Sequence, residues 1–99
     1  GRASVDIIKT GGYKVGAGEV ETALLAHPAV AETAVIGVAD ADLGQRVVAY
    51  VVADAVTTAE LDRFLAEQLT THKRPREIRI VASLPRNAMG KVLKSELAA

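Results

Sequence analysis

The sequence predicts an α/β fold: a small sandwich in which helices flank a three-stranded sheet, with a β-hairpin at the N-terminal end. Three observations support this fold class. Paired glycines separate two short extended runs, apolar runs rich in valine and isoleucine recur later in the chain, and amphipathic helical patterns alternate with these runs. The chain has 99 residues, of which 49% are hydrophobic, so we expect one domain with one modest core and no large enclosed active site.

The first expected element is a short hairpin. Residues 5–9 form an apolar, β-branched run, the turn-forming sequence Thr10-Gly11-Gly12 follows, and residues 13–15 return to an extended pattern. A helix is expected to begin at about Gly16, because apolar residues then recur at helical spacing, and Pro28 should end it. Its apolar face consists of Val20, Ala23, Leu24 and His27.

Two strands are expected next. Residues 32–38 are small and β-branched, and residues 46–53 carry apolar side chains at both parities of a strand. This second pattern is typical of a strand that is covered on both faces, so we expect residues 46–53 to lie in the middle of the sheet. The link between the strands, residues 39–44, is polar at its start and ends on a glycine.

The second half of the chain predicts one more helix and one more strand. Thr57 and Glu60 have the spacing of a capping box, and the apolar stripe that follows indicates a helix to about Thr71. A third core strand is expected over residues 78–81. Residues 83–93 show no periodicity and are too polar for the core, whereas residues 94–99 are compatible with a last short helix.

The composition excludes several kinds of function. Because the chain has no cysteine, it can form no disulfide or thiolate metal site, and the cytoplasm is the expected location. Neither histidine has a partner at the spacing of a metal site, so no metal site is expected. No apolar run approaches the roughly 20 residues of a membrane span. With three aromatic residues and no net charge, the chain is not expected to bind nucleic acid or a membrane.

The glycines match neither the dinucleotide-binding fingerprint nor a phosphate-binding P-loop, so binding of a nucleotide by either motif is excluded. The zero net charge, however, hides an asymmetry. From His72 to Lys94 the chain carries seven basic residues and one acidic residue, a net charge of plus six, and the remainder carries minus six. A basic segment on an acidic body suggests an anionic ligand, and a solvated charged face is the alternative.

Three separated motifs resemble the C-terminal domain of the adenylate-forming superfamily, which includes acyl-CoA synthetases, nonribosomal peptide adenylation domains and luciferases. The motifs are residues 6–15 with residues 19–21, the sequence Lys73-Arg74-Pro75, and residues 85–91. Within the superfamily, residues 8–14, 42–46 and 85–91 are most similar to malonyl-CoA and methylmalonyl-CoA synthetases. The resemblance implies the fold of that domain and a role in an AMP-forming acid–CoA ligase, with no activity of the domain alone.

The resemblance assigns the adenylation step to Lys91. In the family, the matching lysine contacts the substrate carboxylate and the ATP near its α-phosphate while acyl-adenylate and pyrophosphate form. Charge builds up as the two anions meet, and a compact, flexible cation can stabilise it. Gly90 would let the backbone approach closely. The same motif resembles the one that bacterial protein acetyltransferases recognise, which implies that Lys91 is a target of acetylation.

The resemblance also implies a partner domain and a second step. A large N-terminal domain would bind ATP, Mg²⁺ and the acid, and the start at Gly1 without a methionine suggests a fragment or a processed product. After adenylation the small domain would rotate about a hinge within Ser4, Val5 and Asp6. The turn from Lys9 to Tyr13 would then line the pantetheine tunnel of CoA, with Gly11 and Gly12 at the channel.

The basic cluster Lys73, Arg74 and Arg76 aligns with a stretch that some relatives use to hold the phosphates of CoA, and Lys14 and Arg46 are further candidates. A solvated strand edge is the alternative for this cluster.

Two other functions stay open at this point. The chain can be the lid of a synthetase for another carboxylic acid, because the acid pocket would lie in the N-terminal domain. It can also be a free-standing α/β ligand-binding module.

Overall fold

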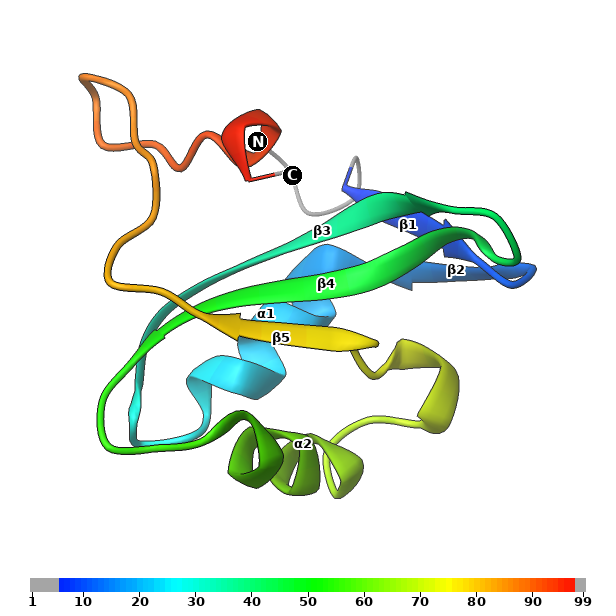
Figure 1. The fold of residues 1–99 in the computed structure, drawn as a ribbon, viewed down its shortest axis with the longest axis horizontal. Helices are drawn as coiled ribbons and strands as arrows, with labels where there is room; N and C mark the ends of the chain where they lie inside the picture. Colours follow the sequence, from blue (N-terminus) through cyan, green and yellow to red (C-terminus); the bar gives the residue numbers. More distant parts are fainter. Residues whose placement is uncertain (1–5, 98–99) are drawn as a thin grey trace.

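The computed structural model describes residues 6–97, and in this part a five-stranded sheet forms the centre of the molecule (Figure 1). The strands are β1 (Ile7–Thr10), β2 (Tyr13–Gly16), β3 (Val30–Asp40), β4 (Gly44–Ala53) and β5 (Glu77–Ile80). The helices are α1 (Ala17–Leu25), α2 (Thr58–Ala66) and two 3₁₀ turns, η2 (Thr71–Lys73) and η3 (Lys94–Glu96). The predicted small α/β sandwich is confirmed.

The N-terminal hairpin closes through a two-residue turn. Thr10 pairs with Tyr13, and the two glycines between them have φ angles of +56° and +86°. Left-handed backbone at both central positions is the geometry that matches the twist of a hairpin, and glycine adopts it without a steric penalty. The hairpin does not stand apart from the predicted three-stranded sheet, because Thr10 also pairs with Gly44 and so extends the sheet.

Strand β4 organises the sheet, as its apolar pattern predicts. It pairs antiparallel with β3 along one edge, and its other edge is shared between β5, which runs parallel to it, and β1. Residues 47–51 are all buried, so β4 is covered on both faces. The remaining core strand of the prediction, β5, is less buried than expected: Ile80 is 38% exposed, because β5 has β4 as its one sheet neighbour in the part of the chain described here.

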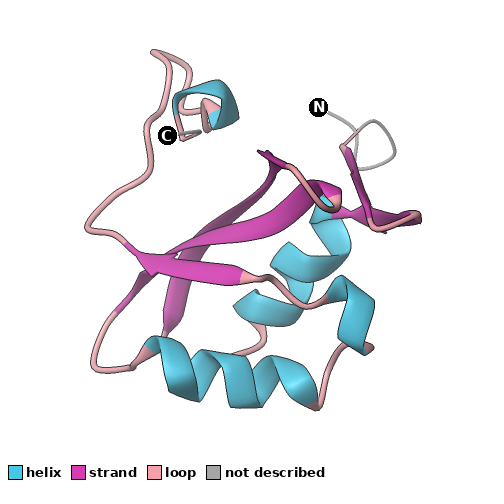
Figure 2. Ribbon diagram, turned by 45° about the vertical axis from the view of Figure 1, so that its right-hand side comes forward, coloured by secondary structure: helices cyan, strands magenta, loops and turns pink. Residues whose placement is uncertain are grey.

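The two faces of the sheet are covered by different parts of the chain (Figure 2). Both α1 and α2 pack on one face, where Val20, Leu24, Leu61 and Leu65 meet alternate residues of β4. The other face is covered by the C-terminal tail, residues 81–97, through Leu84 and Leu97. The prediction that residues 83–93 are too polar for the core is therefore wrong for Leu84, which packs with Leu97 against Tyr50 and Val48.

The second helix begins as predicted and ends early. Thr57 and Glu60 form the capping box, with a Glu60 N–H to Thr57 Oγ1 distance of 3.1 Å. The helix stops at Ala66 rather than near Thr71. Arg74 then donates from Nη2 to the Ala66 carbonyl (3.1 Å), which has no partner within the helix, and from Nε to the Leu69 carbonyl (3.0 Å) in the segment that follows.

No helix among residues 6–97 is both long enough and apolar enough to cross a membrane.

Candidate functional site

The predicted site residues fall into two regions on different sides of the sheet. Lys91 lies in a loop of the C-terminal tail, residues 86–92, called here the Lys91 loop, which extends beyond the sheet at the upper left of Figure 1. The glycine turn of the hairpin and η2 lie at the opposite end of the molecule, on the right of Figure 1. The structure therefore does not bring Lys91 together with the residues predicted to contact CoA.

The Lys91 loop is a small closed hairpin whose shape is held by Asn87. Its side-chain oxygen accepts the N–H groups of both Met89 and Lys91, each at 2.9 Å, and its backbone pairs with Lys91 and Gly90. Gly90 has a φ angle of +84°, where a side chain would be strained. The loop is thus preorganised although it belongs to neither a helix nor a long strand.

The Lys91 side chain is exposed, and no carboxylate of residues 6–97 lies within ion-pair distance of its ammonium group. Other cations of the basic segment are already paired within the domain. Arg86 pairs with Glu32 on β3, Arg79 pairs with Glu77, and Lys73 pairs with Glu19 at 3.0 Å. Lys91 is therefore available to an anion outside the domain.

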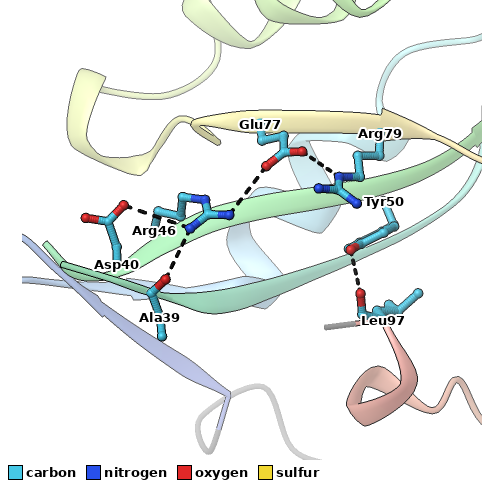
Figure 3. A network of polar contacts seen from close by, with 7 residues as sticks. All are labelled: Ala39, Asp40, Arg46, Tyr50, Glu77, Arg79 and Leu97. Carbon is cyan, nitrogen blue, oxygen red and sulfur yellow. Dashed lines mark hydrogen bonds and ion pairs between the residues drawn. The ribbon is translucent and has the colours of Figure 1, made fainter. Parts of the chain in front are cut away.

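A network of polar contacts fixes the tail and one candidate arginine (Figure 3). The Tyr50 hydroxyl donates to the Leu97 carbonyl at 2.5 Å, and the Arg79 guanidinium lies 5.8 Å from the centre of the Tyr50 ring. Arg46 donates to the Ala39 carbonyl (3.1 Å) and lies 3.8 Å from Glu77 and 4.0 Å from Asp40. These partners inside the domain occupy Arg46, which was a candidate contact for CoA.

Asp40 at one end of this network is held in its charged form. Its Oδ1 atom accepts the N–H groups of Leu43 and Asp42, each at 2.9 Å, and these two hydrogen bonds are the main reason that its pKa lies below the ordinary value. The charges of Arg46 and Arg76 act in the same direction. Asp40 therefore stabilises the turn between β3 and β4, next to the glycine turn of the hairpin.

An open groove of about 530 Å³ lies between the hairpin and η2, and we call it the hairpin groove. Four of the predicted CoA residues line it, together with Thr10, Thr71 and His72: they are Gly11, Tyr13, Arg74 and Arg76. The ring of Tyr13 stacks on the ring of His72 with a centroid distance of 4.1 Å and an interplanar angle of 17°. One wall of the groove is therefore aromatic and another is cationic.

His72 is a groove residue that the sequence analysis missed. The sequence offers it no cysteine, serine or acidic partner at the spacing of a known motif. Its partner, Tyr13, belongs to the hairpin, and only the folding of η2 against β2 brings the two rings together. The residue pattern around His72 carries no signal for this contact. Helix α1 ends at Leu25, so the other histidine, His27, lies beyond the helix and not on its apolar face as predicted, and it accepts the Ala29 N–H on Nδ1 at 3.1 Å.

The other candidates lie outside the groove lining. Lys9 and Lys14 are directly opposite each other across the hairpin, and both are exposed. Gly12 is exposed at the turn with no atom near the position of an added Cβ. Of the three hinge candidates, Ser4 and Val5 lie outside the described residues, and Asp6 contacts Lys94.

Residues 19–91 match the AMP-binding enzyme C-terminal domain family, which accounts for most of the chain. The chain belongs to this family. The mitochondrial malonate–CoA ligase of Mus musculus is 49% identical over 98% of this chain and 17% of its own length. The malonate–CoA ligase of Arabidopsis thaliana is 44% identical over 98% of this chain and 18% of its own length. The resemblance inferred from the sequence motifs is confirmed.

The fold of this AMP-binding enzyme C-terminal domain is also that of solved relatives. An ATP-bound RpMatB-BxBclM chimera superposes with a TM-score of 0.91 at 41% identity, over 95% of this chain and 19% of the chimera. The chain thus spans about a fifth of the length of the relatives it matches. Lys91, the last residue of the family match, lies in the tail loop described above.

Proposed function

We propose that this chain is the mobile C-terminal lid of an ATP-dependent acyl-CoA synthetase that converts malonate or methylmalonate to its CoA thioester through an acyl-adenylate. Lys91 would supply the cation of the adenylation step. The single observation that carries this proposal is the state of Lys91: an exposed ammonium without an ion pair in residues 6–97, on a loop held in shape by its own hydrogen bonds.

The chemistry requires such a group. A carboxylate must attack the α-phosphorus of ATP, and both reactants are anions, so their approach is opposed by charge. An ammonium group placed between them lowers this repulsion and stabilises the negative charge that grows on the phosphoryl oxygens. A lysine already engaged with a carboxylate of its own domain would have to break that pair first. Lys91 carries no such cost toward any carboxylate of residues 6–97.

The hairpin groove is proposed to take part in the second half-reaction. Arg74 and Arg76 can face the phosphates of CoA, and the glycine turn can admit the narrow pantetheine chain because Gly11 and Gly12 lack side chains. Lys9 and Lys14 lie on the hairpin and would add to the positive potential of this end, whereas Lys73 would have to leave Glu19 to contact CoA. Arg74 donates to the Ala66 carbonyl at the end of α2 and to the Leu69 carbonyl after it, and it keeps other donors for a ligand.

The separation of the two regions supports domain alternation. Lys91 and the hairpin groove lie at opposite ends of the molecule, so one orientation of the domain cannot present both to a single active site. A rotation near Ser4, Val5 and Asp6 between adenylation and thioester formation would present them in turn. The partner in both orientations would be a large N-terminal domain that binds ATP and the acid.

Mg²⁺ is proposed to arrive with the phosphates of ATP rather than on this domain. Among residues 6–97, no three side chains of the types that ligate metals are grouped to hold an ion. Mg²⁺ commonly binds through substrate phosphates with few protein carboxylates. Its role would be to neutralise phosphate charge in the N-terminal domain, and Lys91 would act beside it.

The choice of malonate or methylmalonate rests on the relatives, because two of the most similar are named malonate–CoA ligases. The test is acid-dependent exchange of pyrophosphate into ATP by the full-length ligase, with malonate, methylmalonate, succinate, acetate and 4-coumarate compared. We expect exchange with malonate or methylmalonate to exceed the others. Preference for another acid would contradict the proposed substrate but not the proposed role of the chain as a lid. If no acid supports pyrophosphate exchange, the whole proposal is contradicted.

Acetylation of Lys91 by a protein lysine acetyltransferase is proposed as a means of control. The side chain is exposed at a loop, and loss of its charge would remove the group on which adenylation depends. Incubation of the ligase with such an acetyltransferase and acetyl-CoA, followed by mass spectrometry, would reveal the modified peptide. An unmodified Lys91 would contradict this part of the proposal.

The cytoplasmic location stays a prediction, and the mouse relative is named mitochondrial.

A further inference from the structure

Lys94 joins three parts of the domain through one ammonium group. Its Nζ atom contacts Asp6 Oδ2 and lies 2.9 Å from Glu21 Oε2. Asp6 immediately precedes β1, and Glu21 belongs to α1. The same Glu21 oxygen also accepts the backbone N–H of Val35 in β3 at 2.9 Å. The tail is therefore tied to the beginning of the described chain, to a helix and, through Glu21, to the central sheet.

This bridge differs from an ordinary surface ion pair. The Lys94 and Glu21 side chains are 30% and 22% exposed, so solvent screens their interaction less than it screens exposed pairs. Burial by itself lowers the pKa of Lys94, but the hydrogen bonds to Asp6 and Glu21 outweigh it, and the pKa of the ammonium is raised. Lys94 is therefore charged and held between two carboxylates throughout the neutral range.

The position of Lys94 along the tail gives the bridge its importance. Lys94 stands three residues after Lys91, directly below the base of the Lys91 loop, where the Leu93 N–H donates to the Pro85 carbonyl at 2.8 Å. At the N-terminal end of the loop, Arg86 pairs with Glu32 on β3 and donates to the Gly90 carbonyl at 2.5 Å. Both ends of the loop are thus anchored to the sheet by charged groups.

We propose that Lys94 is a positioning residue for Lys91, and that its bridge to Asp6 couples the Lys91 loop to the segment through which the chain enters the domain. This proposal rests on the adenylation role of Lys91 proposed above. Lys91 has a long, flexible side chain, so the placement of its backbone decides whether its ammonium group reaches the reacting phosphate. A small displacement of a charged group costs a large factor in rate, because the charge no longer lies at the reacting atoms.

The test uses Lys94→Met, which keeps the length of the side chain and removes its charge, in the full-length ligase. We expect acid-dependent pyrophosphate exchange to fall by about ten- to a hundredfold. Thioester formation from preformed acyl-adenylate should change by less than about twofold, because it does not use Lys91. Lys94→Arg keeps the charge and should restore most of the exchange. Arg63→Met removes an exposed charge from α2, and this matched control should leave both half-reactions unchanged.

A second measurement reports the loop itself. The amides of Met89, Gly90, Lys91 and Leu93 are hydrogen-bonded in the Lys91 loop or at its base, so their hydrogen exchange measures its order. We expect faster exchange of this group in Lys94→Met and wild-type rates in Lys94→Arg. If Lys94→Met does not fold, Glu21→Gln weakens the same bridge and keeps an oxygen for the Val35 N–H, and it should shift both readouts in the same direction.

If Lys94→Met changes neither the hydrogen exchange of the loop amides nor the rate of pyrophosphate exchange, the proposal is overturned. An equal loss of both half-reactions that Lys94→Arg does not repair would overturn it too, because it would indicate a purely structural role. Failure of the proposed function looks different. If the wild-type ligase shows no acid-dependent exchange, the adenylation role of Lys91 is lost, while the amide exchange of Lys94→Met still decides whether Lys94 anchors the loop.

Discussion

Tyr13 and His72 stack face to face at 4.1 Å and join the hairpin to η2 at the wall of the hairpin groove. Neither ring is part of the core, since Tyr13 is 53% exposed. A stacked aromatic pair contributes about 0.5–1.5 kcal/mol beyond the area it buries. The pair therefore ties the hairpin to η2 at the groove by a contact that lies outside the buried core.

Tyr13→Ala is expected to raise the KM for CoA severalfold and to leave acid-dependent pyrophosphate exchange unchanged, because the groove is proposed to act only after adenylation. Tyr13→Phe keeps the stacked ring and is the matched control, with a KM near that of the wild type. Steady-state kinetics with CoA as the varied substrate checks both variants. A loss of pyrophosphate exchange in Tyr13→Ala would place Tyr13 in the first half-reaction and contradict this assignment.

Lys91→Ala is expected to abolish pyrophosphate exchange, a loss of at least about a hundredfold, and largely to spare thioester formation from preformed acyl-adenylate. Lys91→Arg keeps the charge but not the compact ammonium group, so we expect it to recover only part of the rate. Assay of each half-reaction separately in the full-length ligase makes the comparison. Near-normal exchange in Lys91→Ala would remove the proposed role.

Gly12 and Gly90 provide a matched pair of substitutions. Their φ angles are +86° and +84°, and no atom lies within 4 Å of an added Cβ at either position. A leucine at either site should therefore cost a similar backbone strain of about 1–2 kcal/mol, and its Cβ atom would meet no other atom of the domain. Gly12→Leu is expected to impair thioester formation first, and Gly90→Leu to impair adenylation first.

The two half-reactions, measured on both glycine variants, check this expectation. Because the backbone strain is matched, a difference between the two variants in which half-reaction is impaired reflects the function of each site. It does not reflect the general cost of placing a leucine in a left-handed conformation. If both variants lose both half-reactions equally, the two glycines serve folding alone and the separation of the sites is contradicted.

Asp40→Asn tests the charge at the turn between β3 and β4. The folded-state pKa of Asp40 is lowered, so its charge stabilises the fold above the unfolded-state pKa of about 3.9, and this contribution is lost as the pH falls through the lower folded value. Asparagine can still accept both backbone N–H groups. We expect Asp40→Asn to lower the Tm of the 99-residue chain at pH 7, with a difference that shrinks below about pH 4.

Thermal unfolding followed by circular dichroism at several pH values measures this difference. A Tm difference that stays constant from pH 7 to pH 2.5 would show that the charge of Asp40 is not what stabilises the turn. Ala41→Gly, at an exposed position of the same turn, controls for a general change in the stability of the link and should show no such dependence on pH.

Local patterns predicted all five strands and the helices α1, α2 and η3, because each depends mainly on neighbours within a few residues, whereas the short turn η2 was not predicted. The Gly11-Gly12 turn, the Thr57 capping box and the doubly covered strand β4 are examples. The errors have a common origin in contacts across the chain. The carbonyl at the end of α2 accepts a hydrogen bond from Arg74, and the second face of the sheet is covered by Leu97 and by Leu84 of the aperiodic residues 83–93.

The same division holds for the site. Sequence motifs alone selected Lys91, the glycine turn and the basic cluster, because these motifs resemble those of the family in the same order. Only the tertiary structure showed how these residues differ in their contacts. Arg46 and Lys73 pair with carboxylates of the domain, whereas Lys91 has no ion pair in residues 6–97. The ring of Tyr13 stacks on that of His72. Charge and side-chain length can be read from a sequence, but which charges neutralise one another depends on distances that folding alone sets.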